Sequence, residues 1–282
     1  MQRYQTASSM DARKKFSRFK RERPKASRIL QLSDEKVGQL LKLWEFPIWD
    51  DQISSDDEYA GVLRAVEGLN FSAREIEEFS KALGALQNEE DFGGKAGLLL
   101  SALINSGKDR DYTIHTRKLP YIHCIGYRNC KDLTVVGRAG DYACRQMQGG
   151  TVVIRGNAGE QLGHRMKAGT IIVERNSKNR VGWDMDGGSI TVRRNARRSV
   201  GLWMKGGSIT IEGDAHDDLG YGMTGGEIRV MGNLIFKKRD HDVGIGQEMG
   251  GGTIHLHGSY RYISPKMEAG RVYHRGRLLF DK

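Results

Sequence analysis

MQGGTVVIRGNAGEQLGHR (residues 147–165) is followed by three stretches of the same nineteen-residue length, each of which also opens on methionine. They read MKAGTIIVERNSKNRVGWD, MDGGSITVRRNARRSVGLW and MKGGSITIEGDAHDDLGYG, and they end at residue 222. A fixed period of this kind indicates a repeat architecture. The register extends back to residue 128 and forward through three further methionines, so that eight copies cover 128–282. The glycine-rich run GNAGEQLG is therefore a repeated element and not a phosphate-binding loop, which would have to occur eight times.

Each copy contains one strand-like segment. With methionine as position 1, positions 6 and 8 are apolar while position 7 varies, which is the period of two of a strand with one buried face. These apolar pairs are Leu133 and Val135, Val152 and Ile154, Ile171 and Val173, Ile190 and Val192, Ile209 and Ile211, Ile228 and Val230, and Ile254 and Leu256. No copy can bury this face alone. Copies stacked in register, about 4.8 Å apart, would share one core with the methionines as interior filler.

Glycines at positions 3, 4, 10 and 17 are expected at corners, where a positive φ costs little only for glycine. The structural glycines are Gly137, Gly156, Gly159, Gly163, Gly182, Gly201, Gly213 and Gly220. Position 11 holds Asn157, Asn176, Asn195, Asp214 and Asn233, which we expect to form a ladder at one turn. Position 9 alternates in charge, and we expect its members to pair between rungs: Arg155, Glu174, Arg193 and Glu212.

These features predict an α+β protein, in which a small N-terminal helical region precedes a right-handed parallel β-helix of about eight turns. Leucine-rich repeats fit worse because the leucine ladder and its asparagine are missing, and calcium-binding nonapeptides fit worse because the period is not nine. We expect a basic arm at 1–29, the helical region at 30–118 and the β-helix at 119–282. Segment 111–127 is expected to lead into the first turn.

The helical region carries two apolar stripes at helical spacing and two candidate capping boxes. The stripes are Val37, Leu40, Leu41 and Trp44, and then Ile76, Phe79, Leu83 and Leu86. The boxes run from Ser55 to Glu58 and from Ser72 to Glu75. GGKAGLLLSALINSG, ending at Gly107, predicts a short buried helix, and its GGK lacks the spacing of a phosphate loop.

Composition narrows the class of protein. No apolar run approaches the length of a membrane span and the N-terminus lacks a signal-peptide core, so we expect a cytoplasmic chain that does not enter a membrane. Three cysteines suit a reducing compartment. Residues 1–29 carry ten Lys or Arg against Asp11 and Glu22, which is eight of the ten net positive charges. This arm is expected either to stay disordered or to dock on an acidic partner or RNA.

The pattern MxGGTIxVxGNAGxxxG resembles the GXGXG β-helix superfamily. That superfamily includes the C-terminal domain of the large chain of glutamate synthase and the β-helical subunit of formylmethanofuran dehydrogenase. The resemblance covers the repeat region, about 155 residues, and the full triple-glycine pattern is present only in the copy that starts at Met147. Arg175 and Arg194 replace the corner glycine in the next two copies. The resemblance implies a domain without catalytic residues or cofactor, which holds other domains or subunits in place.

Two residue sets could carry chemistry. His123, Cys124, Cys130 and Cys144 contain the ligand types of a zinc site, although their spacing is not the paired CxxC of such sites. A second set has the carboxylates that acid–base hydrolysis of a polysaccharide would need: Asp184, Asp186, Asp214, Asp217 and Asp218. In the repeat frame these aspartates fall at corners and beside the inward Met185. We therefore expect neither a metal site nor catalytic residues.

Positions 18 and 19 align an aromatic edge, made of Trp183, Trp203 and Tyr221 with His164. Such an edge either packs against the helical region or binds a partner. The copy that starts at Met223 carries seven extra residues around IFKKRDHD, including Lys237, Lys238 and Arg239, and such insertions form loops on one face. The RRNARR run at 193–198 is the one segment of the β-helix that suggests a nucleic-acid surface.

Three functions follow from these observations. The first is a non-catalytic scaffold subunit that binds other protein subunits of a complex for formyl or amido transfer, through the aromatic edge and the inserted loop. The second is a carbohydrate-active β-helix enzyme. The third is an RNA- or ribosome-associated factor that uses the basic arm.

Overall fold

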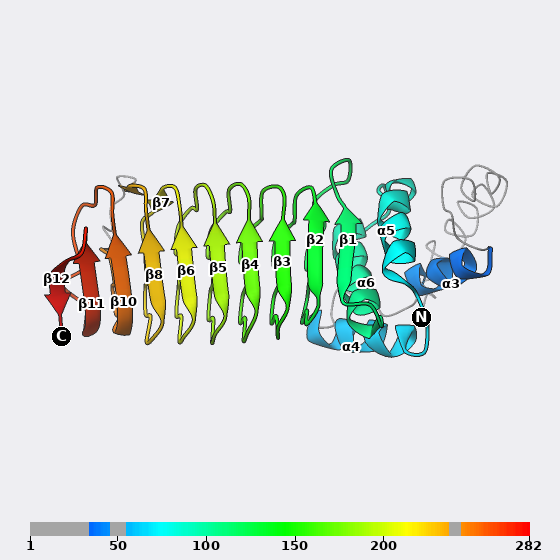
Figure 1. Ribbon diagram of the computed structural model, residues 1–282, viewed down its shortest axis with the longest axis horizontal. Helices are drawn as coiled ribbons and strands as arrows, with labels where there is room; N and C mark the ends of the chain where they lie inside the picture. The colour runs from blue at the N-terminus through cyan, green and yellow to red at the C-terminus, as the bar shows by residue number, and fades with distance from the viewer. Residues whose placement is uncertain (1–33, 46–54, 237–243) are drawn as a thin grey trace, which may run out of the picture.

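A parallel β-solenoid with helices at one end forms the molecule (Figure 1). The computed structural model describes residues 34–45, 55–236 and 244–282, so the basic arm lies outside the described residues. Ten strands form one sheet in sequence order: β1 (Asp111–His115), β2 (Asp132–Val136), β3 (Thr151–Ile154), β4 (Thr170–Val173), β5 (Ser189–Val192), β6 (Ser208–Ile211), β8 (Glu227–Val230), β10 (Gly250–Leu256), β11 (Ala269–His274) and β12 (Arg277–Asp281). β7 (Ala215–His216) and β9 (Leu234–Ile235) form a second, short sheet. The expected helical region and solenoid of about eight turns are confirmed.

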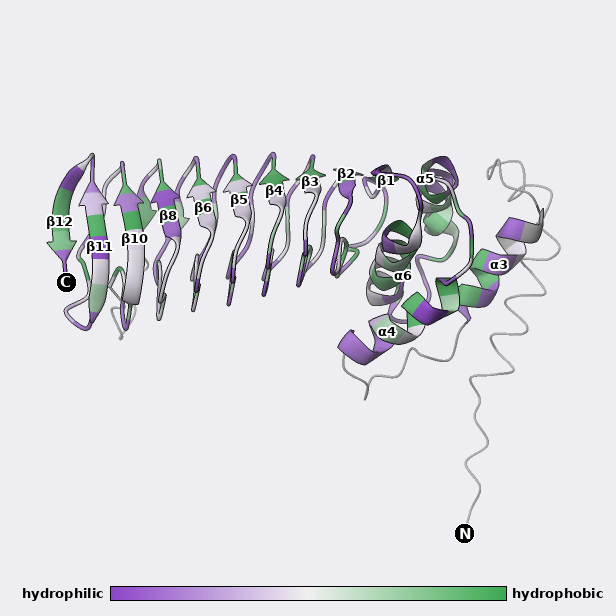
Figure 2. Ribbon diagram, turned by 60° about the horizontal axis from the view of Figure 1, so that its bottom comes forward, coloured by the Kyte–Doolittle hydropathy of each residue, from purple (hydrophilic) through white to green (hydrophobic). Residues whose placement is uncertain are grey.

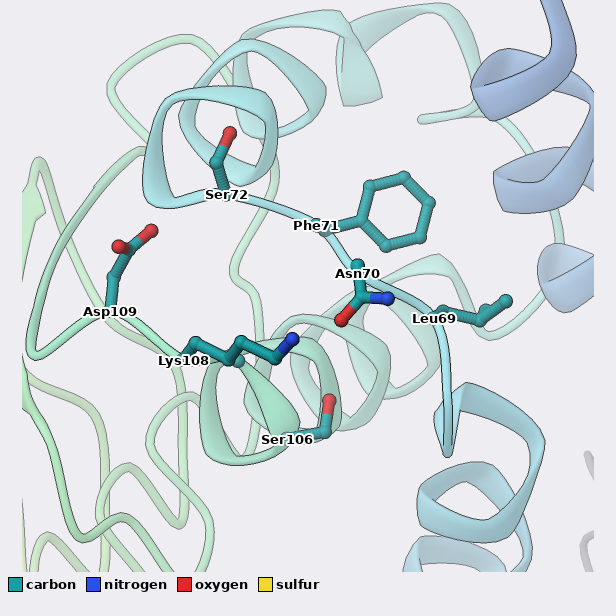
Figure 3. A pocket seen from close by; sticks show the side chains of 8 residues that line it. Leu69, Asn70, Phe71, Ser72, Ser106, Lys108 and Asp109 are labelled. Atoms are coloured by element: carbon teal, nitrogen blue, oxygen red, sulfur yellow. The ribbon is translucent and has the colours of Figure 1, made fainter.

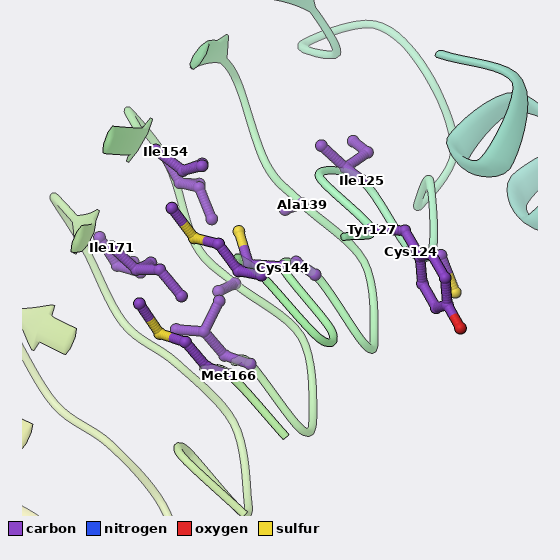
Figure 4. Packing of buried hydrophobic residues seen from close by; sticks show 14 of the residues in the cluster. Cys124, Ile125, Tyr127, Ala139, Cys144, Ile154, Met166 and Ile171 are labelled. Carbon is purple, nitrogen blue, oxygen red and sulfur yellow. The ribbon is translucent and has the colours of Figure 1, made fainter. Parts of the chain in front are cut away.

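The repeat register sets the strand pairing. Thr151 of β3 lies beside Thr170 of β4, and Thr170 lies beside Ser189 of β5, one copy apart each time. Positions 6 and 8 are buried in these strands while positions 5 and 7 are half-buried, as the period of two predicts. The methionine column is also buried, and Figure 4 shows Met166 in the interior near Ile154 and Ile171. One apolar core therefore runs through all the turns.

A side-chain ladder holds one corner together. The Asn157 Oδ1 accepts a hydrogen bond from the backbone N–H of Asn176 at 3.1 Å, and the Asn176 Oδ1 accepts from the N–H of Asn195 at 3.2 Å. The series continues through Asp214 and Asn233, with distances of 2.9 and 2.7 Å. The predicted ladder is confirmed. It works through the side-chain oxygens and not through left-handed backbone, because none of these residues has a positive φ.

Two of the expected glycine columns have different physical roles. At position 17 the glycines have φ near 70°, for example 67° at Gly163, and Cys144 occupies the same column with φ 57°. At position 10, Gly156 has no positive φ, but a Cβ there would lie 2.2 Å from the carbonyl oxygen of Gly137 in the preceding turn. The expectation that every corner glycine supplies a positive φ is therefore wrong. At Gly156 the missing side chain permits close stacking instead.

The alternating charges at position 9 do not pair as expected. Within the described part of the chain, no ion pair within 4.0 Å involves Arg155, Glu174, Arg193 or Glu212. Three of these side chains are exposed and Glu174 is half-buried. The long side chains of this column extend into solvent, where an isolated pair gains little.

The helices precede the solenoid in the chain, and the last of them is long and mostly buried. They are α3 (Asp34–Trp44), α4 (Ser55–Val66), α5 (Ala73–Ala82), the 3₁₀ turn η1 (Leu83–Ala85) and α6 (Phe92–Ser106). The capping box of Ser72 and Glu75 at α5 is confirmed. The box expected at Ser55 involves a side chain outside the described residues. Figure 2 shows the hydrophobic residues of α6, which is mostly buried, as its sequence predicts.

α6 covers the first turn of the solenoid. The hydroxyl of Ser101 donates a hydrogen bond to the carbonyl oxygen of Cys124 (3.1 Å) and accepts one from the N–H of Gly126 (3.0 Å). The N–H of His123 donates to the carbonyl oxygen of Gly93 at 3.0 Å. The helix therefore supplies hydrogen bonds that a preceding turn would otherwise supply. β1 pairs in parallel with β2, so the sheet begins at Asp111, inside the range expected to be helical.

The other end of the solenoid finishes in an antiparallel pair. β12 turns back and pairs with β11, the only antiparallel pairing among the described strands. Met267 and Val272 remain buried at this end, and Phe280 of β12 packs against the same core. In the described ranges, no helix has the length and apolar character needed to cross a bilayer.

Candidate functional site: an aromatic row along one edge of the solenoid

Aromatic rings from successive turns form a row along one edge. The His164 and Trp183 rings stack with centroids 4.5 Å apart and an interplanar angle of 13°. Trp183 and Trp203 follow at 6.0 Å in a tilted arrangement, and Tyr142 lies 6.3 Å from His164 on the other side. We call these four residues, Tyr142, His164, Trp183 and Trp203, the aromatic row. Their regular succession follows from the repeat, because positions 15, 18 and 19 lie next to each other on every turn.

The N-terminal end of the row meets the helical region. The guanidinium of Arg145 lies 5.9 Å from the Tyr142 ring and 5.6 Å from the Tyr127 ring. Tyr127 in turn packs against Tyr59 of α4, with centroids 4.8 Å apart. Asp56 of the same helix lies 3.8 Å from Arg145 and also accepts a hydrogen bond from Gln146. This end of the row is therefore an internal contact between the helices and the solenoid.

The opposite end of the row is open. Trp203 is 49 % exposed, the most exposed of the large apolar side chains in the described residues. Its backbone is left-handed, with φ 54°, and its ring lies over Gly222 of the next turn, where a Cβ would stand 2.3 Å from the indole Cδ1. The missing side chain at residue 222 gives the indole room to lie against the backbone. A large apolar ring held in place and left exposed is typical of an interaction site.

Tyr221 does not continue the row. Its hydroxyl is hydrogen-bonded to the Glu248 and Gln247 side chains, and the Glu248 carboxylate raises the pKa of Tyr221. No ring contact joins Tyr221 to Trp203 among the described residues. The expected trio of Trp183, Trp203 and Tyr221 is therefore brought together only in part. The other expected contacts, Lys237, Lys238 and Arg239, lie outside the described residues.

Two polar atoms of the row are buried without a partner. Among the described residues, neither the Nδ1 of His164 nor the Nε1 of Trp183 has a hydrogen-bond partner. Burial, together with the nearby Arg145 and Arg165, lowers the pKa of His164 to about 4, so the imidazole is neutral at pH 7. Buried indole N–H groups usually find an acceptor. The row thus combines a buried, unpaired N–H with the exposed Trp203 ring.

Sequence reasoning missed two members of this site. Tyr142 stands at position 15, which is polar in the following copies, and Arg180 stands at the same position with its guanidinium 5.5 Å from the Trp183 ring. Both have a positive φ, 59° and 61°, which neither side chain would suggest. The sequence contained a signal for this contact. Arg180 at position 15 precedes Trp183 at position 18 by three residues, and this spacing lets the two side chains meet across the corner.

The aspartates are held in ion pairs and hydrogen bonds. Asp184 lies 2.9 Å from the Nε of Arg165 and 2.5 Å from the Nζ of Lys205. Burial raises the pKa of Asp184, but the hydrogen bonds from Lys205 and Arg165 outweigh it and leave the pKa below its ordinary value. Asp217 pairs with Arg198 at 2.8 Å. A general acid needs a raised pKa, so the environment of Asp184 favours a structural role.

The remaining carboxylates of that set are engaged in the same way. Asp186 lies 3.6 Å from the Nζ of Lys205, and Asp214 belongs to the asparagine ladder. Asp218 accepts a hydrogen bond from the Ser199 hydroxyl at 3.5 Å. These contacts join neighbouring turns, so the carboxylates stabilise the stack.

The three cysteines and His123 do not form a ligand cluster among the described residues. Burial raises the pKa values of Cys124 and Cys144 to about 12, so both side chains are protonated thiols at neutral pH. Cys130 is exposed, and the Nδ1 of His123 accepts a hydrogen bond from the N–H of Asp141 at 3.1 Å. In the part of the chain that the structure describes, no group of three His, Cys, Asp or Glu residues could hold a metal ion.

Two shallow hollows lie elsewhere on the surface. One, of about 240 Å³, lies between the segments that join α4 to α5 and α6 to β1, with Phe71, Lys108 and Asp109 on its walls (Figure 3). Asp109 there accepts a hydrogen bond from the N–H of Ala73, at the start of α5. The other, of about 300 Å³, lies near β10 and β11 and is lined by Arg229, His255 and Tyr273. Both are open at the surface, unlike the enclosed sites that bury small ligands.

Comparison with known proteins does not assign the chain to a family. No protein-family model matches the chain, and no curated protein matches it either. Function therefore has to be argued from the surfaces of the molecule itself.

Proposed function

We propose that this protein is a non-catalytic scaffold subunit that holds another protein subunit of a larger complex on the aromatic row. The observation that carries the proposal is the exposed Trp203 ring, packed against Trp183, whose buried indole N–H has no acceptor among the described residues. Tryptophan dominates many interface hot spots because it buries a large area and offers one directed donor. A partner that supplies an apolar surface would bury the exposed Trp203 ring.

The resemblance of the repeat to the GXGXG superfamily supports the same function. Domains of that type position the catalytic parts of their complexes, and here the aspartates of the corners join neighbouring turns. By this resemblance we propose formyl or amido transfer as the chemistry of the complex, carried out by other subunits in the cytoplasm.

The test compares complexes captured on tagged chains from the native organism. Replacing Trp183 and Trp203 by Ser is expected to remove the protein that co-purifies with the unaltered chain, while the circular dichroism of the solenoid persists. The matched control is Tyr273→Ser, because Tyr273 is a half-buried ring on the sheet face, stacked on His255 at 5.0 Å and far along the solenoid. Retention of the partner by the tryptophan variant would contradict the proposal. Polysaccharide cleavage by the purified chain that Asp184→Asn abolishes would also contradict it.

A further inference from the structure

A second surface carries a concentration of positive charge that the fold does not use. Arginines and one lysine follow the outer side of the corner between the large and the short sheet, on three successive turns. We call this surface the basic strip; its members are Arg155, Arg175, Lys178, Arg193, Arg194 and Arg197. All are exposed except Lys178, which is half-buried. In the corresponding stretches of the same turns, 155–161, 174–180 and 193–199, the carboxylates are Glu160 and Glu174.

The members of the strip lie on adjacent rungs. The N–H of Arg197 donates to the carbonyl oxygen of Lys178 at 3.3 Å, and the N–H of Arg193 donates to the carbonyl oxygen of Val173, two residues before Arg175, at 2.9 Å. Arg175 and Arg194 both occupy position 10, so their backbones are one rung apart, about 4.8 Å. Like charges directly opposite each other on neighbouring strands destabilise a sheet. The stability of the fold therefore gives no reason for placing Arg175 and Arg194 on adjacent rungs.

Three of these arginines have no ion-pair partner within 4.0 Å among the described residues. No ion pair, side-chain hydrogen bond or ring contact there involves the side chains of Arg175, Arg194 or Arg197. Asn176 and Asn195, which lie beside them, are occupied in the ladder. The strip thus presents free guanidinium forks, the geometry that binds phosphate oxygens in pairs.

The residues around the basic strip favour a nucleic acid over an acidic protein as its ligand. A protein interface has an apolar centre, but none of the exposed large apolar side chains of the described residues belongs to the strip. Interfaces with nucleic acids are instead polar and strongly positive. One aromatic ring borders the strip: Tyr121 is 38 % exposed, with Lys178 Nζ 5.3 Å and Arg138 Cζ 4.3 Å from its centroid. A basic track beside an aromatic ring is the arrangement that binds single strands, by phosphate contact and base stacking.

We infer that the basic strip, with Tyr121 at its border, binds the phosphate backbone of a single-stranded nucleic acid without reading its sequence. This goes beyond the scaffold function, because the strip and the aromatic row are different surfaces with different chemistry. A chain that holds a protein on one edge and a nucleic-acid strand on one corner would join the two.

The experiment measures fluorescence anisotropy of a short labelled single-stranded RNA with the full-length chain over a range of salt concentrations. Arg175→Gln, Arg194→Gln and Arg197→Gln together are expected to reduce the slope of log K against log salt by about 2, since each single-strand phosphate contact contributes about 0.7. Tyr121→Ser is expected to weaken binding about tenfold and leave the slope unchanged. The charge-matched control replaces the exposed Lys266, Arg271 and Arg277 by Gln. Because every variant contains residues 1–29, the arm contributes equally throughout.

Three results would overturn the inference. One is an equal slope for the strip variant and its control. Another is a Tyr121→Ser chain that binds as tightly as the unaltered chain. The third is displacement of the RNA by polyglutamate as effectively as by unlabelled RNA, which would assign the strip to an acidic protein. The Trp183 and Trp203 double variant should bind the RNA normally, so this inference and the scaffold function can fail separately.

Discussion

At the residue scale, the effect of a substitution in a strand depends on whether the side chain faces the core or the solvent. Val192 is fully buried, whereas Thr191, the preceding residue, is half-buried on the outer face. Val192→Asp would leave a carboxylate in the core without a partner, and we expect it to lower the free energy of unfolding by more than about 3 kcal/mol. Thr191→Asp is expected to cost less than about 1 kcal/mol. Urea denaturation of both variants checks the register, which would be wrong if the two costs were equal.

His164 gives the second prediction at this scale. Its pKa in the folded protein is about 4, against an ordinary value of 6.5, so between these values the unfolded chain binds more protons than the folded one. The free energy of unfolding should therefore fall as the pH drops from about 6.5 towards 4, by at most about 1.4 kcal/mol per pH unit from this residue.

His164→Phe keeps a ring against Trp183 but cannot titrate. Urea denaturation at several pH values should show a shallower loss of stability for this variant than for the unaltered chain. If both chains lose stability equally on acidification, the histidine is not held neutral in the folded state.

The sequence shows clearly which residues are buried but not how the corners turn. Val152 and Ile154 could be assigned to the core because alternation in a strand is a direct consequence of backbone geometry. The left-handed backbone at Arg180 and Trp203 could not, because neither residue type favours it. That backbone directs the Trp203 ring over Gly222 and separates it from Tyr221, which is why the aromatic trio was predicted only in part.

At the scale of elements, α6 acts as the first layer of the solenoid. A Cβ on Gly97 would lie 1.6 Å from the carbonyl oxygen of His123, so the helix backbone rests directly on the first turn. Gly97→Ala should therefore push the helix away and lower the free energy of unfolding by about 2 kcal/mol or more. Gly94→Ala on the same helix meets nothing within 4 Å and should stabilise the chain by up to about 1 kcal/mol.

Guanidinium denaturation of the two alanine variants measures this difference. Equal stabilities would show that α6 is not tightly docked on the solenoid. The sequence predicted the helix but not its position, because the first turn departs from the repeat: Asp111 pairs with Asp132, twenty-one residues later instead of nineteen. Contacts between Ser101 and residues 124–127 lie outside any periodic pattern.

At the scale of the whole molecule, the repeat creates two long surfaces with different chemistry. Position 18 and its neighbours form the aromatic row, and positions 9 to 13 form the basic strip on the adjoining corner. One end of the row is linked to α4 through Arg145 and Tyr127, and the most exposed ring, Trp203, lies at the other end. A solenoid suits this arrangement because every turn repeats the same outward positions.

The most direct test of the scaffold function is hydrogen–deuterium exchange of the free chain and of the native complex captured on it. The row predicts that binding protects the backbone around His164, Trp183 and Trp203, and leaves the outer face of β4 and β5 unchanged. Protection centred on that sheet face, with none around Trp203, would contradict the proposal that the aromatic row is where this protein holds its partner.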